Sequence, residues 1–315
     1  MLDLPRFIAP MPNLWRDGAT WVSEVRRLEA MGFHSVAVSH HVIHGWQLGL
    51  LVALAFAAAN TTRLRVLSLV AQNYFYHPAL LAKDIATIDV LSGGRVELGI
   101  GTGWLAGDYN ALGLQLERPG IRVAKLEESL EVIRRYFSDE YVDFAGDYYN
   151  INHMEALPRC VQQPRPPILV AAGSPRMLDL AGRTADIVGI HAEMGCKELK
   201  DAPIHDLAAA SIEAKIGRVR AAAAAVGRPS PRFQFSCYHV DVTDAPQHSH
   251  RRSSWAPHVE ARMDSLKDSP AVLVGTAAEC ASKILDWQER FGISYWHLGP
   301  DVEATSRIVE RVHPG

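Results

Sequence analysis

The sequence has few cysteines, and they form no pattern. Cys160, Cys196, Cys237 and Cys280 are the only four in 315 residues, and no two of them make a Cys-x-x-Cys pair. Their wide spacing excludes a zinc ribbon. We therefore expect four ordinary reduced thiols.

An excess of positive charge and a long apolar run are also missing. The chain has 32 Lys and Arg against 35 Asp and Glu, a net charge of −3, so no broad cationic surface is available for nucleic-acid phosphates. The apolar run over residues 48–59 is too short to span a bilayer, and the amino terminus lacks a basic stretch followed by an apolar signal core. These absences predict a cytoplasmic protein without nucleic-acid or membrane binding.

Hydrophobic residues make up 48% of the chain and charged residues 21%, enough for a sizeable core. Short β-rich runs alternate with amphipathic segments. The predicted strands cover residues 6–9, 35–38, 64–70, 96–100, 168–171, 187–190, 232–240 and 295–298. The predicted helices cover residues 15–31, 48–60, 78–91, 121–137, 175–184, 206–226, 277–291 and 302–312. Eight such pairs predict an α/β fold, a single (β/α)8 TIM barrel over residues 1–315. An open doubly wound sheet is the alternative.

Two segments interrupt the repeat. Residues 141–152 alternate around an Ala145-Gly146-Asp147 turn and predict a β-hairpin after the fourth strand and helix. Residues 241–270 are polar and irregular, which predicts a long loop after the seventh strand. This loop is either a mobile lid or a solvated surface insertion.

The most informative stretch runs from Asp89 to Trp104. A helix ends at Ser92-Gly93-Gly94, and a buried strand then runs into Gly99, Gly101 and Gly103. Glycines at the carboxyl end of a barrel strand leave room for a ligand to approach the backbone. An isolated Gly-x-Gly-x-Gly can also serve only to ease a tight strand end.

Histidines follow the second predicted strand, in Ser39-His40-His41-Val42-Ile43-His44. At least one imidazole is expected at the barrel mouth, where it can exchange a proton with a substrate. A histidine that is hydrogen-bonded in the core is the alternative. A metal site is not predicted, because the segment has no His-Glu-x-x-His pattern and no nearby carboxylate.

A second polar cluster links the fifth strand to the next helix, in Ala171-Ala172-Gly173-Ser174-Pro175-Arg176. Unpaired N–H groups at a helix start attract phosphate, Gly173 permits close approach, the Ser174 hydroxyl adds a donor, and Arg176 can add charge. Plain capping by Ser174 is the alternative. Together with the amide side chains after residues 67–71, this set predicts a long, flat, phosphorylated cofactor.

At this point the chain resembles the luciferase-like monooxygenase superfamily, and within it a subgroup assigned to coenzyme F420. The resemblance runs from about Gly32 to Ile190 and resumes weakly at Val274-Gly275-Thr276. It is carried by Leu91-Ser92-Gly93-Gly94-Arg95, Leu98-Gly99-Ile100-Gly101-Thr102-Gly103-Trp104, Tyr109-x-x-Leu112-Gly113, Gln163-Pro164-Arg165-Pro166-Pro167 and Ala185-Asp186.

The resemblance implies a homodimer with a flavin-like ring in the barrel mouth and a cis non-proline bond at Ser68-Leu69. The cofactor-binding residues that it implies are Ser39, Ser68, Leu69, Gly101, Thr102, Gly103, Ala171, Ala172, Gly173 and Ser174. It implies that His40 is the catalytic residue. Related enzymes have an Asp-His pair at these two positions, whereas this chain has Ser39-His40, without the aspartate. Trp104 stands where sugar-phosphate dehydrogenases have a glutamate, so glucose 6-phosphate is not the expected substrate.

These features predict an F420-dependent oxidoreductase. It would transfer a hydride between reduced deazaflavin and a C=C or C=N bond of a small organic substrate, in a pocket shaped by Trp104, His44 and the 241–270 loop. Two alternatives remain at this stage. One is an FMN-dependent monooxygenase that uses reduced flavin and oxygen, and the other is a non-catalytic flavin-binding barrel.

Overall fold

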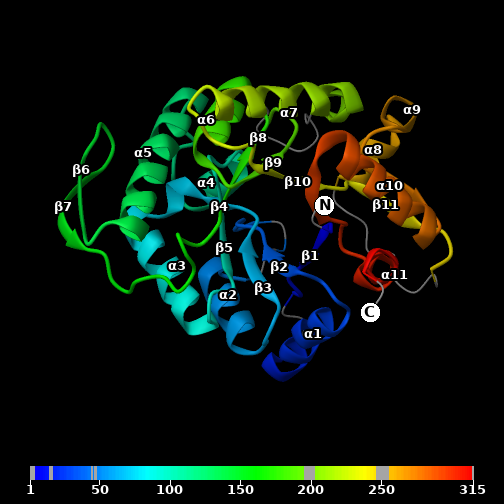
Figure 1. Ribbon diagram of the computed structural model, residues 1–315, viewed down its shortest axis with the longest axis horizontal. Coiled ribbons are helices and arrows are strands. Elements are labelled where there is room, and N and C mark those ends of the chain that lie inside the picture. Colours follow the sequence, from blue (N-terminus) through cyan, green and yellow to red (C-terminus); the bar gives the residue numbers. More distant parts are fainter. Residues whose placement is uncertain are drawn as a thin grey trace.

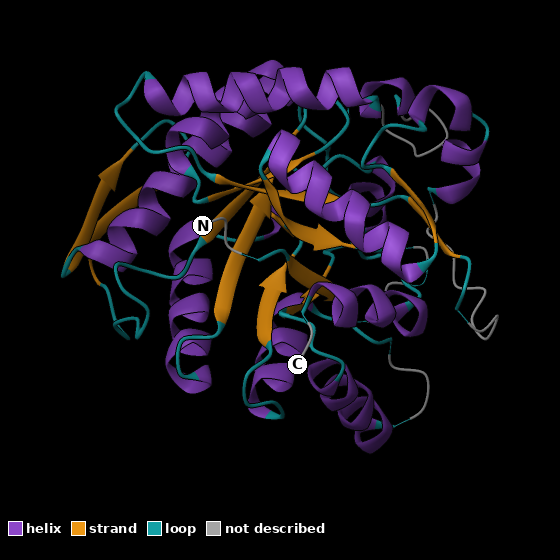
Figure 2. Ribbon diagram, turned by 45° about the vertical axis from the view of Figure 1, so that its right-hand side comes forward, coloured by secondary structure: helices purple, strands orange, loops and turns teal. Residues whose placement is uncertain are grey.

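Eight parallel strands form a closed barrel in the computed structural model, and helices surround it (Figures 1 and 2). The structure describes residues 4–13, 17–43, 45, 48–194, 203–245 and 255–313. The barrel strands are β1 (Arg6–Pro10), β2 (Ser35–Val38), β3 (Arg65–Ser68), β5 (Val96–Gly101), β8 (Ile168–Ala172), β9 (Ile187–Ile190), β10 (Arg232–Ser236) and β13 (Ile293–His297). Pairing of β1 with β13 and of β3 with β5 completes the ring. The predicted TIM barrel is confirmed, and the open sheet is excluded.

The helices follow the strands as expected and cover the outside of the barrel. They are α1 (Gly18–Ala30), α2 (Leu50–Ala59), α3 (Pro78–Ser92), α5 (Pro119–Ser138), α6 (Pro175–Thr184), α7 (Ala209–Ala224), α10 (Ala277–Phe291) and α11 (Val302–Val312). Local signals set several ends. Helix α3 begins at Pro78 and is closed by Gly93 at φ 67°, and Thr276 and Glu279 form a capping box at the start of α10. None of the helices described is long and apolar enough to cross a membrane.

Side chains that point into the barrel form a core of their own. Ile8, Ala37, Leu67, Leu169, Ile187 and Tyr295 make up this inner cluster, while the larger cluster fills the layer between strands and helices. Interior side chains of this kind make the barrel a packed core rather than a pore. A ligand site is therefore confined to the ends of the strands and the loops beyond them.

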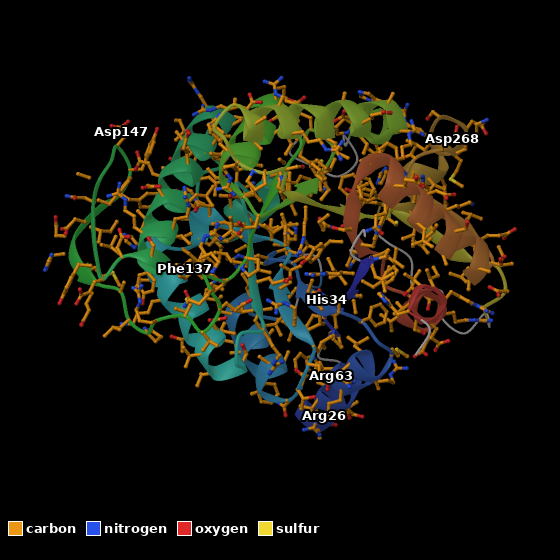
Figure 3. All side chains as sticks on the ribbon, in the orientation of Figure 1. Arg26, His34, Arg63, Phe137, Asp147 and Asp268 are labelled. Carbon is orange, nitrogen blue, oxygen red and sulfur yellow. The ribbon has the colours of Figure 1, made fainter. Side chains whose placement is uncertain are left out.

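The predicted hairpin is present outside the barrel. Strands β6 (Tyr141–Ala145) and β7 (Asn150–Glu155) pair antiparallel, and Asp147 lies at their tip (Figure 3). The Glu128 carboxylate of α5 accepts hydrogen bonds from the backbone N–H groups of Asp147, Tyr148 and Tyr149, at 2.8, 3.0 and 3.1 Å. One helix side chain therefore fixes the hairpin to the barrel.

The prediction for the seventh strand and its loop is wrong in part. The strand ends at Ser236, and residues beyond it form β11 (His239–Val242), which pairs with β12 (Val272–Gly275) outside the barrel. Two short helices follow β11, namely α8 (Ala256–Glu260) and α9 (Met263–Leu266), while residues 246–254 lie outside the described part. Helices of five and four residues are too short to give a periodic signal, so the segment resembles a loop in the sequence.

The described cysteines, Cys160, Cys237 and Cys280, are free thiols, as expected. Cys196 lies outside the described residues. Burial raises the pKa of the Cys237 thiol well above its ordinary value, which keeps it protonated and unreactive.

Candidate active site

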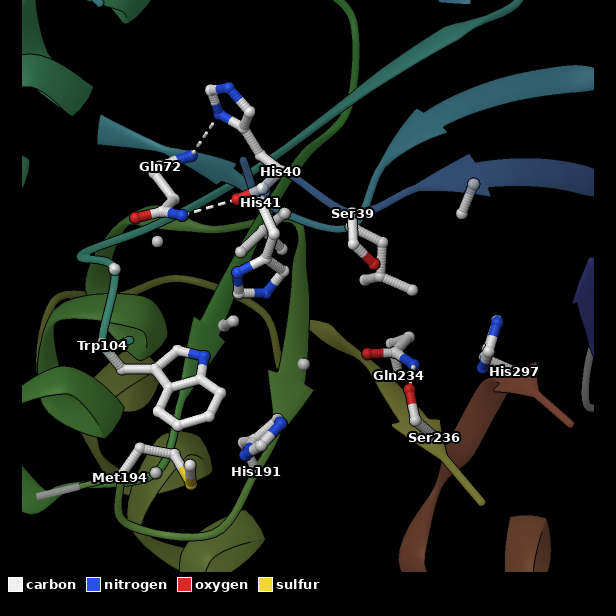
Figure 4. Close-up of a pocket in the computed structure, with 18 of the residues that line it drawn as sticks. Ser39, His40, His41, Gln72, Trp104, His191, Met194, Gln234, Ser236 and His297 are labelled. Carbon is white, nitrogen blue, oxygen red and sulfur yellow. Dashed lines mark hydrogen bonds between the residues drawn. The ribbon is translucent and has the colours of Figure 1, made fainter. Parts of the chain in front are cut away.

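A cavity of about 570 Å³ opens at the carboxyl ends of the barrel strands (Figure 4). The predicted site residues that line it are Ser39, His40, Leu69, Gly101, Thr102, Gly103, Trp104, Ala171, Ala172, Gly173 and Ser174. They lie at the ends of four different strands, or just after them, and meet only in the folded barrel. His44, the other predicted pocket residue, lies outside the described residues. The cavity is thus located where the sequence placed it, and the individual roles stay predictions.

Ser68 does not reach the cavity. It is fully buried, and its hydroxyl donates to the Gly99 carbonyl at 2.8 Å and accepts from the Gly99 N–H at 2.9 Å. The cis non-proline bond joins Leu69 and Val70, one residue later than expected, and both residues line the cavity. Strand β3 still includes Ser68, so the cis bond falls one residue later in the sequence. The prediction that Ser68 binds the cofactor is therefore wrong.

The three glycines after residue 98 are all required by packing within the chain. A Cβ on Gly99 would lie 1.9 Å from the Ser68 carbonyl oxygen, and one on Gly101 would lie 2.9 Å from a Val70 methyl. Gly103 has φ +72°, and a Cβ there would lie 2.2 Å from the Tyr109 hydroxyl oxygen. Packing at the strand end therefore explains why glycine occupies all three positions. As a result, Gly101 and Gly103 present bare backbone to the cavity.

His40 lines the cavity, and its ring packs against aromatic side chains. Its ring points away from the cavity centre (Figure 4) and stacks on Tyr76 with 5.2 Å between centroids, while Phe75 meets it edge-on at 5.2 Å. Its Nδ1 accepts the backbone N–H of Gln72 at 3.2 Å. Burial lowers the pKa of His40 to about 4, so the imidazole is neutral at pH 7. This packing agrees with the alternative, a hydrogen-bonded and packed histidine, but His40 also lines the cavity, and its catalytic role stays a prediction.

His41 has the opposite arrangement. Its ring points into the cavity toward Trp104 (Figure 4), with the two rings edge-on at 6.3 Å. Its Nδ1 lies 2.6 Å from Oδ2 of Asp108, which is fully buried in α4 (Ala106–Ala111). The histidine that faces the cavity therefore has a carboxylate partner that the sequence did not indicate. Among the described residues, no cluster of three or more His, Cys, Asp and Glu side chains suits a metal ion.

Several hydrogen bonds fix the charge of Asp108. Burial alone would raise its pKa, but donation from His41, from the Val42 N–H at 3.0 Å and from Gln72 Nε2 at 3.0 Å holds the pKa of Asp108 below its ordinary value. An ionised carboxylate can only accept, so the hydrogen in the contact with His41 is on Nδ1. Gln72 Nε2 also donates to the His40 carbonyl at 2.5 Å, which connects the two histidines.

The start of α6 offers hydrogen-bond donors at another part of the cavity. Ser174 occupies the N-cap position, but its hydroxyl makes no capping hydrogen bond, and Pro175 follows at the first helical position. Gly173 is required by packing, because a Cβ there would lie 2.3 Å from the Ala192 carbonyl oxygen. Arg176 donates to the Gly120 carbonyl at 3.1 Å and does not line the cavity. The helix start and Ser174 fit a phosphate, whereas the suggested charge from Arg176 is not supplied.

Polar and aromatic side chains that the sequence did not indicate complete the wall. Gln234 and Ser236 of β10 lie beside His297 of β13 (Figure 4), and Gln234 Nε2 donates to the Ser236 hydroxyl at 3.1 Å. Burial lowers the pKa of His297 to about 4. Trp255, from the segment predicted as a loop, also lines the cavity, so this segment borders the site as expected.

A parallel barrel with a cavity at the carboxyl ends of its strands has the architecture of TIM-barrel enzymes. The family model for luciferase-like monooxygenases matches residues 16–294, and the chain belongs to this family. It is similar to the F420-dependent glucose-6-phosphate dehydrogenase of Kineococcus radiotolerans, with 36% identity over 164 residues, 50% of this chain and 48% of the relative.

The chain is also similar to a relative named for a different cofactor and, over its whole fold, to a solved structure. The FMNH(2)-dependent dimethylsulfone monooxygenase of Pseudomonas putida is 30% identical over 128 residues, 41% of this chain and 35% of the relative. An F420-dependent secondary alcohol dehydrogenase, solved with an F420-acetone adduct, superposes over 99% of both chains with a TM-score of 0.77 and 18% identity. The last similarity concerns the fold alone. The chain spans half or less of the length of the two sequence relatives.

Proposed function

We propose that the protein is an F420-dependent oxidoreductase that transfers a hydride between reduced deazaflavin and a C=C or C=N bond of a small organic substrate. The observation that carries the proposal is the His41–Asp108 pair at the cavity, with 2.6 Å between Nδ1 and Oδ2. F420-dependent relatives support the choice of cofactor.

The residues present fit such a cofactor. Ser174, with no capping bond, and the N–H groups at the start of α6 would hold its phosphate. The bare backbone at Gly101 and Gly103, with Leu69 and Val70, offers a flat wall for the ring system. When bound, reduced F420 supplies the hydride.

The protein's own part is to handle the proton. Asp108 accepts from Nδ1–H of His41, which fixes the orientation of the ring. Proton exchange with a ligand then takes place at the other ring nitrogen, Nε2. Trp104 lies next to the His41 ring and excludes water from the same part of the cavity.

The second candidate is an FMN-dependent monooxygenase built on the same site. The relative that uses FMNH(2) favours it, and no described residue at the cavity distinguishes a flavin from a deazaflavin ring. Because deazaflavin does not readily activate oxygen, the identity of the cofactor decides the reaction class.

Side-by-side titration of the purified protein with F420 and FMN, followed by the reduced forms under air, tests the proposal. We expect F420 to bind in the micromolar range or tighter, and reduced F420 to be stable to air on the protein. Tight FMN binding with oxygen consumption and no affinity for F420 would contradict the proposal and favour the second candidate. Binding of either cofactor without any turnover would favour the non-catalytic barrel.

We also propose that the protein is a homodimer, with α2 and α3 at the interface. Helix α2 consists of ten apolar residues, and Val52 and Phe56 on it are 77% and 48% exposed. On the neighbouring α3, Leu80 and Leu91 are exposed as well. An apolar patch shared by two adjacent helices is typical of a subunit contact.

A further inference from the structure

One part of the cavity wall is a connected series of aromatic rings. Trp104 and Trp255 have centroids 6.5 Å apart, Trp255 and Tyr238 are 4.8 Å apart, and His191 lies 5.7 Å from Trp255 and 5.8 Å from Tyr238. At the other end, Trp104 meets His41 at 6.3 Å. All five rings line the cavity.

These rings come from distant parts of the chain. His41 follows β2, Trp104 follows β5, His191 follows β9, Tyr238 follows β10, and Trp255 precedes α8. Figure 4 shows His41, Trp104 and His191 around the same side of the cavity, with Met194 beside them. Rings gathered from five segments onto one wall form a surface that is complementary to another flat ring, through offset and edge-on contacts.

The electrostatics of this wall do not suit an anionic substrate. Among the described lining residues, Arg122 is the one cationic side chain apart from the histidines. Its guanidinium is committed to the backbone, with Nε donating to the Glu117 carbonyl at 3.0 Å and a terminal nitrogen donating to the Gly103 carbonyl. Burial lowers the pKa of His191 to about 4, so this ring is neutral at pH 7, and the Glu193 carboxylate lies at the exposed rim.

We infer that the substrate is an uncharged, planar, conjugated cyclic carbonyl compound that lies against Trp104, Tyr238 and Trp255. The reaction assigned to it rests on the proposed function. Bound reduced F420 would supply a hydride to the carbon β to the carbonyl, and the C=C electron pair would move toward the carbonyl oxygen to give an enolate. His41 Nε2–H then protonates the α carbon. The ring C=C is reduced, the cofactor is oxidised, and one proton is consumed.

Isothermal titration calorimetry with three probes tests the substrate class, both without and with F420. Coumarin is planar, uncharged and conjugated, hex-2-enal has the same conjugation without a ring, and glucose 6-phosphate is anionic. We expect coumarin to bind at least tenfold more tightly than hex-2-enal, and glucose 6-phosphate to show no binding. Equal or tighter binding of either of the other probes, or no binding of coumarin, overturns the inference.

Variants of the aromatic wall provide the second measurement. Trp255→Ala should weaken coumarin binding at least tenfold, whereas Trp255→Phe should stay within threefold of the wild type because a ring remains. Trp287→Phe is the matched control, since Trp287 stacks on Trp296 with 5.7 Å between centroids and does not line the cavity. If Trp255→Ala binds coumarin as the wild type does, the aromatic wall is not the binding surface.

The two proposals fail in different ways. If F420 does not bind but coumarin binding depends on Trp255, the cofactor assignment is wrong and the substrate class stands. If F420 binds and hex-2-enal is reduced as well as coumarin, the cofactor assignment stands and the substrate class is wrong.

Discussion

Nδ1 of His41 and Oδ2 of Asp108 lie 2.6 Å apart, although the two residues are 67 positions apart in the chain. Since Asp108 is buried and its pKa is held below the ordinary value, the pair has a fixed orientation and a fixed negative partner. It resembles the histidine–carboxylate pairs that orient general acids and bases in other enzymes.

Removing the pair should reduce turnover more than binding. We expect His41→Ala to lower kcat about 100-fold, the lower end of what general acid–base catalysis contributes, with KM changed much less. Asp108→Asn should lower kcat about tenfold, because the His41 ring loses the carboxylate that orients it. Steady-state kinetics from pH 5 to 9 measures both effects.

The neighbouring histidine supplies the control for that experiment. His40→Asn retains a side-chain acceptor for the Gln72 N–H, the contact that His40 Nδ1 makes at 3.2 Å. We expect kcat of this variant to stay within about threefold of the wild type. A large loss in His40→Asn together with a small one in His41→Ala would restore the role that the sequence assigned to His40.

Ser174 is the position at which the phosphate site can be tested. Gly173 is unsuitable, because any Cβ there would meet the Ala192 backbone and disturb the fold. Ser174→Asp should weaken F420 binding at least tenfold through charge repulsion at the start of α6, whereas Ser174→Ala should weaken it only a few-fold. Fluorescence titration of F420 measures both variants, and unchanged affinity in Ser174→Asp would place the phosphate elsewhere.

Buried histidines should make the fold sensitive to mild acid. The folded-state pKa of His297 is lowered by burial to about 4, below the usual unfolded value near 6.5. The unfolded state therefore binds more protons between pH 6.5 and 4, and the free energy of unfolding should decrease as the pH falls through this window. Replacing His297 with Gln should reduce this slope by about 1.4 kcal/mol per pH unit, measured by denaturant unfolding at several pH values. An unchanged slope would show that the pKa of His297 is not lowered in the native state.

A charge on the apolar patch should separate the proposed dimer. Phe56→Asp on α2 is expected to shift the mass measured by light scattering from two chains to one, because a carboxylate cannot be buried there without a partner. Leu285→Asp is the matched control. Leu285 is 45% exposed on α10, away from the patch, so its replacement should leave the mass unchanged. A wild-type protein that is monomeric at all concentrations would contradict the proposal.

The sequence predicts most of the fold because the signals for helix ends are local. The sequence predicts helices over residues 175–184, 277–291 and 302–312, and the structure shows the same bounds. Proline, serine, threonine or aspartate stands directly at the start of each. The seventh strand was predicted too long because Cys237 and Tyr238 are as apolar as the strand before them. What changes is the backbone pairing: Cys237 N–H still donates to the His297 carbonyl at 2.8 Å, whereas Tyr238 N–H donates to the Ala271 carbonyl at 2.9 Å. A local sequence pattern does not show which strand a backbone N–H pairs with.

The site was predictable in position but not in orientation. Strand ends identified Ser39, Gly101 and Ser174 as neighbours of one cavity. Which of two adjacent histidines faces that cavity depends on the backbone direction after Val38, and Asp108 joins His41 only through the tertiary packing of α4. The error at Ser68 has a similar cause: the sequence locates the end of β3 to within one residue and no better.

The hairpin of β6 and β7 stands apart from this chemistry. Its turn is held by the Glu128 carboxylate through three backbone N–H groups, and none of its residues lines the cavity. A cysteine introduced at exposed Asp147 would therefore give a handle for immobilising the protein on a surface or coupling a dye. The mouth of the barrel would stay open to solution in a protein attached in this way.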